Sequence, residues 1–168
     1  MSRLDSFIRR LEAQRACLNF ALDEIRSIDG PILEFGLGNG RSYDHLRERA
    51  PAREIYVFDR VVAAHPDCIP PERYLIFGDL FETLARAAPL IGAPAALAHL
   101  DIGAGLAASD RKLSELIARH LPDLLARGAM VVSDQRVAAP ALGRLRAPNG
   151  VAEDRYFLYR AGGAKGPA

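Results

Sequence analysis

The sequence predicts a single α/β domain built on a doubly wound, mostly parallel sheet. Five short apolar runs alternate with helical or proline-containing segments along the chain. Several runs are almost continuously apolar, as expected of strands that are covered on both faces. Strands that alternate with crossover segments form an open, doubly wound sheet. The length of 168 residues suits one domain, 1–168, with one hydrophobic core.

Composition limits the class of protein further. Hydrophobic residues make up 49% and charged residues 26%, which is typical of globular chains and excludes intrinsic disorder. We expect no membrane span, since no apolar stretch reaches about 18 residues, and the N-terminus does not resemble a signal peptide. The formal charge of +1 gives no reason to expect nucleic acid as a partner. The two cysteines, Cys17 and Cys68, lie outside any C-x-x-C spacing, so we expect a reducing cytoplasm.

The first element is an N-terminal helix within residues 1–29. Its apolar residues recur at steps of three, four and seven, which is the period of one helix face. Ser2 and Asp5 have the spacing of a capping box, and Asp29-Gly30-Pro31 ends the helix. The stripe consists of Leu4, Ile8, Leu11, Leu18, Leu22 and Ile25.

The strands and helices of the core follow within residues 30–135. The apolar runs cover residues 31–35, 54–58, 74–77, 95–100 and 129–133. Helical patterns cover residues 42–50, 80–88 and 106–127, which Pro51, Pro89 and Gly128 end. The segment 60–73 contains three prolines, so it predicts a loop or a very short helix. Residues 136–168 predict an edge strand at Tyr156–Tyr159 and a frayed tail.

Acidic residues stand at the end of all five predicted strands. Glu34 is the next-to-last residue of the first strand, and the other four acids each end one of the next four strands. Ligands of doubly wound sheets bind at the carboxyl ends of the strands, so one rim would carry all five acids. The alternative is that each acid merely caps the next helix. These acids are Glu34, Asp59, Asp79, Asp101 and Asp134.

A glycine-rich loop follows the first strand. Gly36, Gly38 and Gly40 let the backbone turn tightly and approach a ligand, and the next helix offers free N–H groups to an anion. A dinucleotide fingerprint would need its third glycine at position 41, where this chain has Arg41. The spacing therefore argues against NAD or FAD, as does the lack of a Tyr-x-x-x-Lys pair. A bare structural turn is the alternative.

These motifs resemble the class I S-adenosylmethionine-dependent methyltransferases. That family has an acid and G-x-G-x-G after strand one, as in Glu34–Gly40, and acids that end strands two, three and four. The stretch Gly36–Glu48 is most similar to small, stand-alone bacterial members. The resemblance covers about residues 30–135 and implies a Rossmann-like methyltransferase fold with S-adenosyl-L-methionine as cofactor. The part after strand five is shortened relative to the family.

The resemblance also assigns roles to residues at the rim. The glycine loop would hold the amino-acid end of the cofactor, and Glu34 would serve its ammonium group, directly or through water, and help to hold the loop. Asp59 would accept hydrogen bonds from both ribose hydroxyls. Asp79 and Leu80 would hold the adenine.

Catalysis would need mainly alignment and a base. Asp101 would face the methyl group, and it shares one side of its strand with His99, so both are candidate bases near the acceptor. A core histidine with satisfied hydrogen bonds is the alternative for His99. Catechol-type O-methyltransferases hold a metal with an Asp after strand four and Asp-Asn after strand five. Here Gln135 follows Asp134, so we predict no metal site.

The predicted function is methyl transfer from S-adenosyl-L-methionine to an unidentified acceptor, which we expect to be a small molecule. The alternative is a non-catalytic protein that binds the same cofactor for regulation or assembly. No basic stripe or aromatic platform points to nucleic acid. A homo-oligomer is compatible with the sequence.

Overall fold

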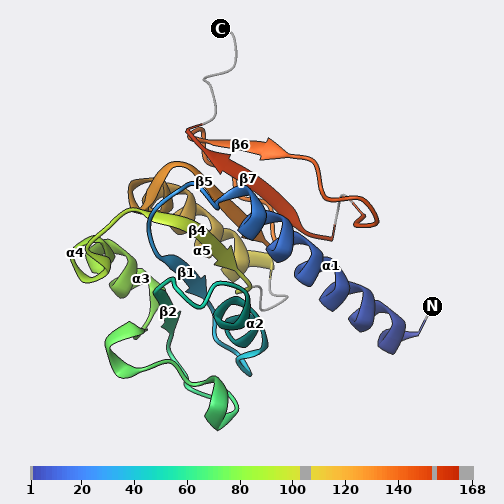
Figure 1. The fold of residues 1–168 in the computed structure, drawn as a ribbon, viewed down its shortest axis with the longest axis horizontal. Coiled ribbons are helices and arrows are strands. Elements are labelled where there is room, and N and C mark those ends of the chain that lie inside the picture. Colours follow the sequence, from blue (N-terminus) through green and yellow to red (C-terminus); the bar gives the residue numbers. More distant parts are fainter. Residues whose placement is uncertain (1, 103–106, 153–154, 163–168) are drawn as a thin grey trace, which may run out of the picture.

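Seven strands form one mixed sheet in the computed structural model, which describes residues 2–102, 107–152 and 155–162 (Figure 1). The strands are β1 (Ile32–Phe35), β2 (Ile55–Asp59), β3 (Leu75–Phe77), β4 (Ala95–Leu100), β5 (Leu125–Ser133), β6 (Leu142–Leu145) and β7 (Phe157–Ala161). Their order is β3-β2-β1-β4-β5-β7-β6. The first five strands pair in parallel, and β7 runs antiparallel between β5 and β6. The predicted fold class is confirmed.

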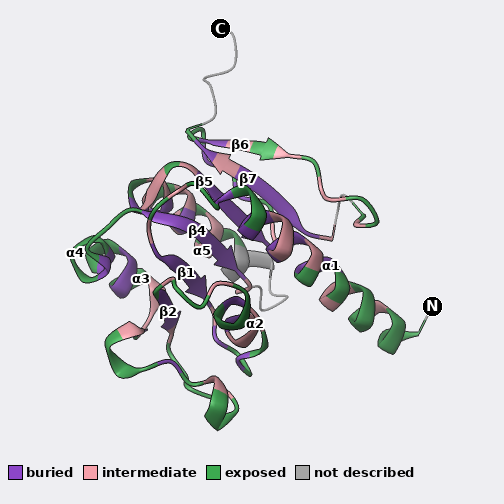
Figure 2. Cartoon of the chain, in the orientation of Figure 1, coloured by how far each residue is buried: buried purple, intermediate pink, exposed green. Residues whose placement is uncertain are grey.

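Helices cover both faces of this sheet (Figure 1). On one face, α1 (Arg3–Glu24) and α2 (Arg41–Arg49) pack on the apolar side chains of one core cluster. On the other face lie α3 (Leu80–Thr83), α4 (Ala87–Ile91) and α5 (Ala107–His120). The central strands are buried along their length, as Figure 2 shows. None of the helices in the described ranges combines the length and apolar character that a bilayer span needs.

Helix α1 begins as the sequence predicts, with the capping box of Ser2 and Asp5. It ends at Glu24, however, before the predicted stop at Asp29-Gly30-Pro31. The guanidinium of Arg53 donates to the main-chain carbonyls of Ile25, Ile28 and Gly30 at 2.7–2.9 Å. These bonds satisfy carbonyl groups beyond the helix end, which stabilises an early exit toward β1.

Two of the predicted crossover helices differ from the structure. The predicted helix at 80–88 is divided into α3, a 3₁₀ turn at Leu84–Arg86, and α4. The helix predicted at 106–127 ends at His120, and its first residue lies outside the described residues. A 3₁₀ turn at Leu121–Leu124 follows, since Pro122 has no N–H to continue the α-helix. The segment 60–73 holds only the 3₁₀ turns Pro66–Cys68 and Glu72–Tyr74, as predicted.

Strand β5 begins four residues earlier than predicted. Gly128 does not end a helix but lies inside this strand, with φ +82°. The register between β4 and β5 shifts between the pairs Ala95–Leu125 and Leu97–Met130, so extra residues of β5 bulge out at this point. A glycine with positive φ is a common residue of such bulges.

The C-terminal region was predicted wrongly in one respect. The strand at Tyr156–Tyr159 was expected at the edge, but β7 lies between β5 and β6, and β6 forms the edge. The shortened region therefore completes an antiparallel hairpin. Residues 134–141 connect β5 to β6 without a helix, and the hydroxyl of Tyr159 accepts a hydrogen bond from Val137 N at 2.9 Å. The predicted tail at 163–168 lies outside the described residues.

Candidate functional site

The acids that follow the parallel strands lie on one edge of the sheet. Asp101 N donates to Phe35 O at 3.1 Å, and Asp134 N donates to Leu100 O at 3.0 Å. Asp59 O accepts from Gly78 N at 3.0 Å. These main-chain bonds continue the ladders past the strand ends, so the carboxylates of Asp59, Asp101 and Asp134 belong to the same rim.

The glycine loop is closely packed at its two ends and open in its middle. Gly36 and Gly40 have φ of +89° and +84°. A Cβ on Gly36 would lie 2.7 Å from Asp101 O, and one on Gly40 would lie 2.4 Å from the Cβ of Cys68. A Cβ on Gly38 would meet nothing within 4 Å. The loop therefore offers exposed backbone at Gly38, where a ligand can approach.

Asp59 holds this loop through its carboxylate. Its Oδ2 accepts from Leu37 N at 2.7 Å and Gly38 N at 3.3 Å, and its Oδ1 accepts from Val61 N at 2.9 Å. A carboxylate offers about four acceptor positions, so about one remains for a ligand. The expectation that Asp59 accepts from both ribose hydroxyls stays a prediction.

Asp79 has the capping role that the sequence left open. Its side chain is the N-cap of α3 and accepts from Phe81 N at 2.8 Å. Leu80 is half-buried and packs against the core. Their predicted contact with an adenine ring stays a prediction.

A buried ion pair lies behind the loop. Glu34 and His99 are both 0% exposed, and His99 Nδ1 lies 2.7 Å from Glu34 Oε2. Ser42, in the first turn of α2, donates to the other oxygen of Glu34. Burial lowers the pKa of His99, but the charge of Glu34 and its hydrogen bond outweigh burial, so this pKa is raised. Glu34 thus ties β1 to α2 and to His99.

The burial of these two side chains contradicts the prediction that His99 is a base at the acceptor, and it limits the predicted role of Glu34 to support of the loop. His99 cannot touch an acceptor, because its side chain is enclosed between the sheet and α1. It is a core residue with satisfied nitrogens. Glu34 is equally enclosed, so direct contact with an ammonium group does not fit the structure, whereas its predicted support of the loop does.

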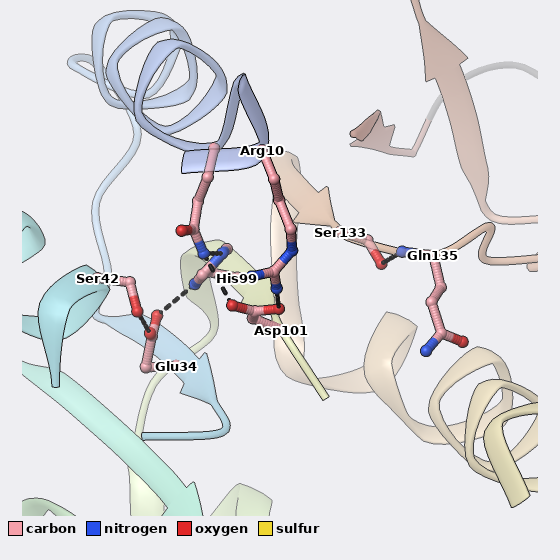
Figure 3. A network of polar contacts seen from close by, with 8 residues as sticks. Arg10, Glu34, Ser42, His99, Asp101, Ser133 and Gln135 are labelled. Carbon is pink, nitrogen blue, oxygen red and sulfur yellow. Dashed lines mark hydrogen bonds and ion pairs between the residues drawn. The ribbon is translucent and has the colours of Figure 1, made fainter. Parts of the chain in front are cut away.

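Helix α1 adds two residues that the sequence analysis missed. Gln14 Nε2 lies 3.3 Å from His99 Nε2 and 3.0 Å from Asp101 Oδ2. Arg10 forms an ion pair with Asp101, and Figure 3 shows the side chains of Arg10, His99 and Asp101 converging. Arg10 and Gln14 are four residues apart, hence on one helix face. A polar residue at position 14, within the buried stripe of α1, was the available signal.

A small pocket with a cavity volume of about 90 Å³, open to solvent, joins these features. One wall is the glycine loop and the start of α2, and the other is α1, with Asp101 between them. The lining residues are Phe7, Arg10, Leu11, Gln14, Gly36, Leu37, Gly38, Asn39, Arg41, Ser42 and Asp101.

Gln135 occupies the position at which catechol-type O-methyltransferases have a metal-binding asparagine. The side chain of Gln135 lies away from Asp101 in Figure 3, and its Oε1 accepts from Ser114 Oγ at 3.4 Å. Asp101 is already engaged by Arg10 and Gln14. Across the described ranges, no three His, Cys, Asp or Glu side chains group as metal ligands would.

Comparisons with known proteins agree on one family. A family model described as S-adenosyl-L-methionine methyltransferase matches residues 1–161. A crystal structure of an S-adenosyl-L-methionine methyl transferase from Silicibacter pomeroyi is 44% identical, with a TM-score of 0.89, over 96% of this chain and 99% of that one. The fold is shared with MycE methyltransferase of the mycinamycin pathway, solved with Mg and SAH (TM-score 0.57, 14% identity, 92% and 47% covered). It is also shared with TrmN from Thermus thermophilus, with a TM-score of 0.53 and 16% identity over 88% of this chain and 48% of that one. No curated sequence matches.

Proposed function

Because the chain belongs to the S-adenosyl-L-methionine methyltransferase family, we propose that it methylates a small-molecule acceptor in the pocket beside the glycine loop. The chain is a methyltransferase, and its cofactor is S-adenosyl-L-methionine. One observation carries the proposal: the open backbone at Gly38, the Arg10–Asp101 ion pair and the apolar side chains of α1 line the same pocket.

The chemistry of this pocket fits the amino-acid end of the cofactor. That end is a zwitterion, and the pocket presents a guanidinium from Arg10 and a carboxylate from Asp101 side by side. The loop before α2 adds backbone N–H groups and the positive end of the helix dipole, which favour a carboxylate. Asp59 would bind a ribose hydroxyl, and Asp79 with Leu80 would bind the adenine.

The remaining work of the protein is alignment and proton removal. The cofactor supplies an already activated methyl group on a sulfonium. Asp101 is the group that faces the pocket, so it would accept the proton of the acceptor, while Gln14 and Arg10 hold its carboxylate. Phe7 and Leu11 would contact the body of the acceptor, which favours an apolar or aromatic molecule.

An assay of cofactor turnover with pools of candidate small molecules tests this function. We expect one pool to give S-adenosylhomocysteine release above the rate without acceptor. Asp101→Asn should lower kcat on that acceptor about 100-fold or more, since the amide cannot accept the proton. Unchanged turnover in Asp101→Asn, or activity only on polynucleotides, would contradict the proposal.

We also expect transfer to be independent of metal. Gln135 stands where the metal-dependent pattern has asparagine and binds Ser114 instead. EDTA should therefore leave the turnover rate within about twofold, and added magnesium should not raise it; a metal enzyme would lose activity, because a bound ion activates the acceptor hydroxyl. A crystal grown in magnesium with a density peak about 2.1 Å from Asp101 and Asp134 would also refute this expectation.

The compartment and the domain division are further proposals. Cys17 and Cys68 are both free thiols, which supports a reducing cytoplasm. The cofactor core at 30–135, the N-terminal helix and the C-terminal hairpin share one sheet and its covering layers, which supports a single domain.

A further inference from the structure

The side-chain amide nitrogen of Gln14 lies between two groups that both need a donor. It is 3.3 Å from His99 Nε2 and 3.0 Å from Asp101 Oδ2. An amide nitrogen carries two hydrogens, so it donates to both groups when His99 Nε2 is unprotonated. The ring proton of His99 then sits on Nδ1, which faces Glu34 Oε2 at 2.7 Å. This arrangement selects one neutral tautomer of His99.

A second proton on His99 would break this arrangement. The new Nε2–H would point at the amide hydrogens of Gln14. Rotation of the amide by half a turn would offer its oxygen to His99, but the same oxygen would then face Asp101 in place of the donor. The carboxylate of Asp101 would lose one of its two partners on α1 and keep only Arg10.

The surroundings of His99 favour binding of this second proton. Burial opposes it, but nearby carboxylates favour it, so the pKa of His99 is raised. The ring of Tyr156 stacks on the imidazole, with centroids 6.3 Å apart and 13° between planes. The charged or titratable groups facing the pair are Glu34 from β1, Asp101 after β4, Asp134 after β5, Arg10 from α1, and Tyr156 before β7.

We propose that Gln14 is a positioning residue that transmits the protonation state of the buried Glu34–His99 pair to the carboxylate of Asp101. The inference rests on the proposed function in one respect, that Asp101 contributes to cofactor binding. The sign follows from the geometry: Asp101 is best held when His99 is neutral, so cofactor affinity falls as pH falls through the pKa of His99.

The test combines two measurements on the whole chain. Calorimetry follows the affinity for S-adenosylhomocysteine between about pH 5.5 and 9, and ¹⁵N NMR follows the protons on both nitrogens of His99. In the wild type we expect a proton on Nδ1 in the neutral ring, and affinity lowered about tenfold, the equivalent of one hydrogen bond to a charged group, once Nε2 is protonated.

Two variants separate a positioning role from a structural one. In Gln14→Met, His99 should still titrate, but the pH step in affinity should disappear. In Gln14→Glu, the new carboxylate should keep His99 protonated to higher pH, and affinity should be low throughout. Gln135→Met is the control: it removes a half-buried glutamine of the rim that does not contact His99, so the step should persist.

Three outcomes would overturn the inference: a proton on Nε2 in the neutral ring, a pH step that survives in Gln14→Met, or a wild-type affinity that is flat while His99 titrates. Complete absence of binding by S-adenosylhomocysteine would instead refute the proposed function. The NMR result would then still decide whether Gln14 sets the tautomer of His99.

Discussion

Replacement of His99 by leucine is expected to destabilise the fold by about 3–5 kcal/mol. The change removes the imidazole that is hydrogen-bonded to Glu34, whose carboxylate is fully buried and would keep only the hydroxyl of Ser42. A buried charge that has lost its partner costs more than the pair itself contributes. Urea denaturation of the purified chain at pH 7 measures this loss as a lower midpoint with an unchanged slope.

The double variant Glu34→Leu/His99→Leu provides the control. With both charges removed, leucines occupy the two neighbouring positions, which are paired across β1 and β4, and no buried charge remains. Most of the lost stability should return, since a buried pair can be replaced by apolar residues at little cost. If His99→Leu alone loses less than about 1 kcal/mol, Glu34 has found water or another partner, and the buried pair does not hold the loop as described.

Replacement of Asp59 by alanine is expected to weaken binding of S-adenosylhomocysteine by about 30- to 1,000-fold, on the order of 2–4 kcal/mol. Two effects add. The ribose loses a charge-assisted hydrogen bond, and the glycine loop loses the acceptor for Leu37 N and Gly38 N. Isothermal titration calorimetry measures the change directly.

Asp59→Asn separates the two effects. Its amide oxygen can still accept from the loop, so the loop should stay in place while the charge is lost, and affinity should fall about tenfold. The three backbone hydrogen bonds to the Asp59 carboxylate also predict that Asp59→Ala lowers the stability of the fold by about 1–3 kcal/mol. Affinity of Asp59→Ala within threefold of wild type would place the ribose elsewhere.

Patterns local in the sequence were sufficient for most of the fold. The apolar stripe and the Ser2–Asp5 box gave the start of α1, and the continuous apolar runs gave the five parallel strands, because burial on both faces leaves a direct trace in composition. The end of α5 was missed, since the pattern of apolar residues continues through the 3₁₀ turn into β5 although Pro122 stops the α-helix. Strand β6 was missed because LGRL is short and half exposed at the sheet edge.

The site was predictable only in part, because some of its contacts join residues that are far apart in the sequence. Spacing along the chain showed that acids and glycines meet at the carboxyl ends of strands, which is a property of parallel sheets. It did not show that α1 crosses this rim, because the contacts of Gln14 with His99 and Asp101 join residues 85 and 87 positions apart. The buried state of Glu34 and His99 depends on that crossing, and so does their role.

A crystal structure of the chain with S-adenosylhomocysteine tests the central claim most directly. We predict that the amino-acid end lies against the open backbone at Gly38 and between Arg10 and Asp101, with the ribose at Asp59. Glu34 and His99 should stay paired and out of contact with the ligand. Density for S-adenosylhomocysteine at another surface, or an empty glycine loop in crystals that bind NAD there, would contradict this account.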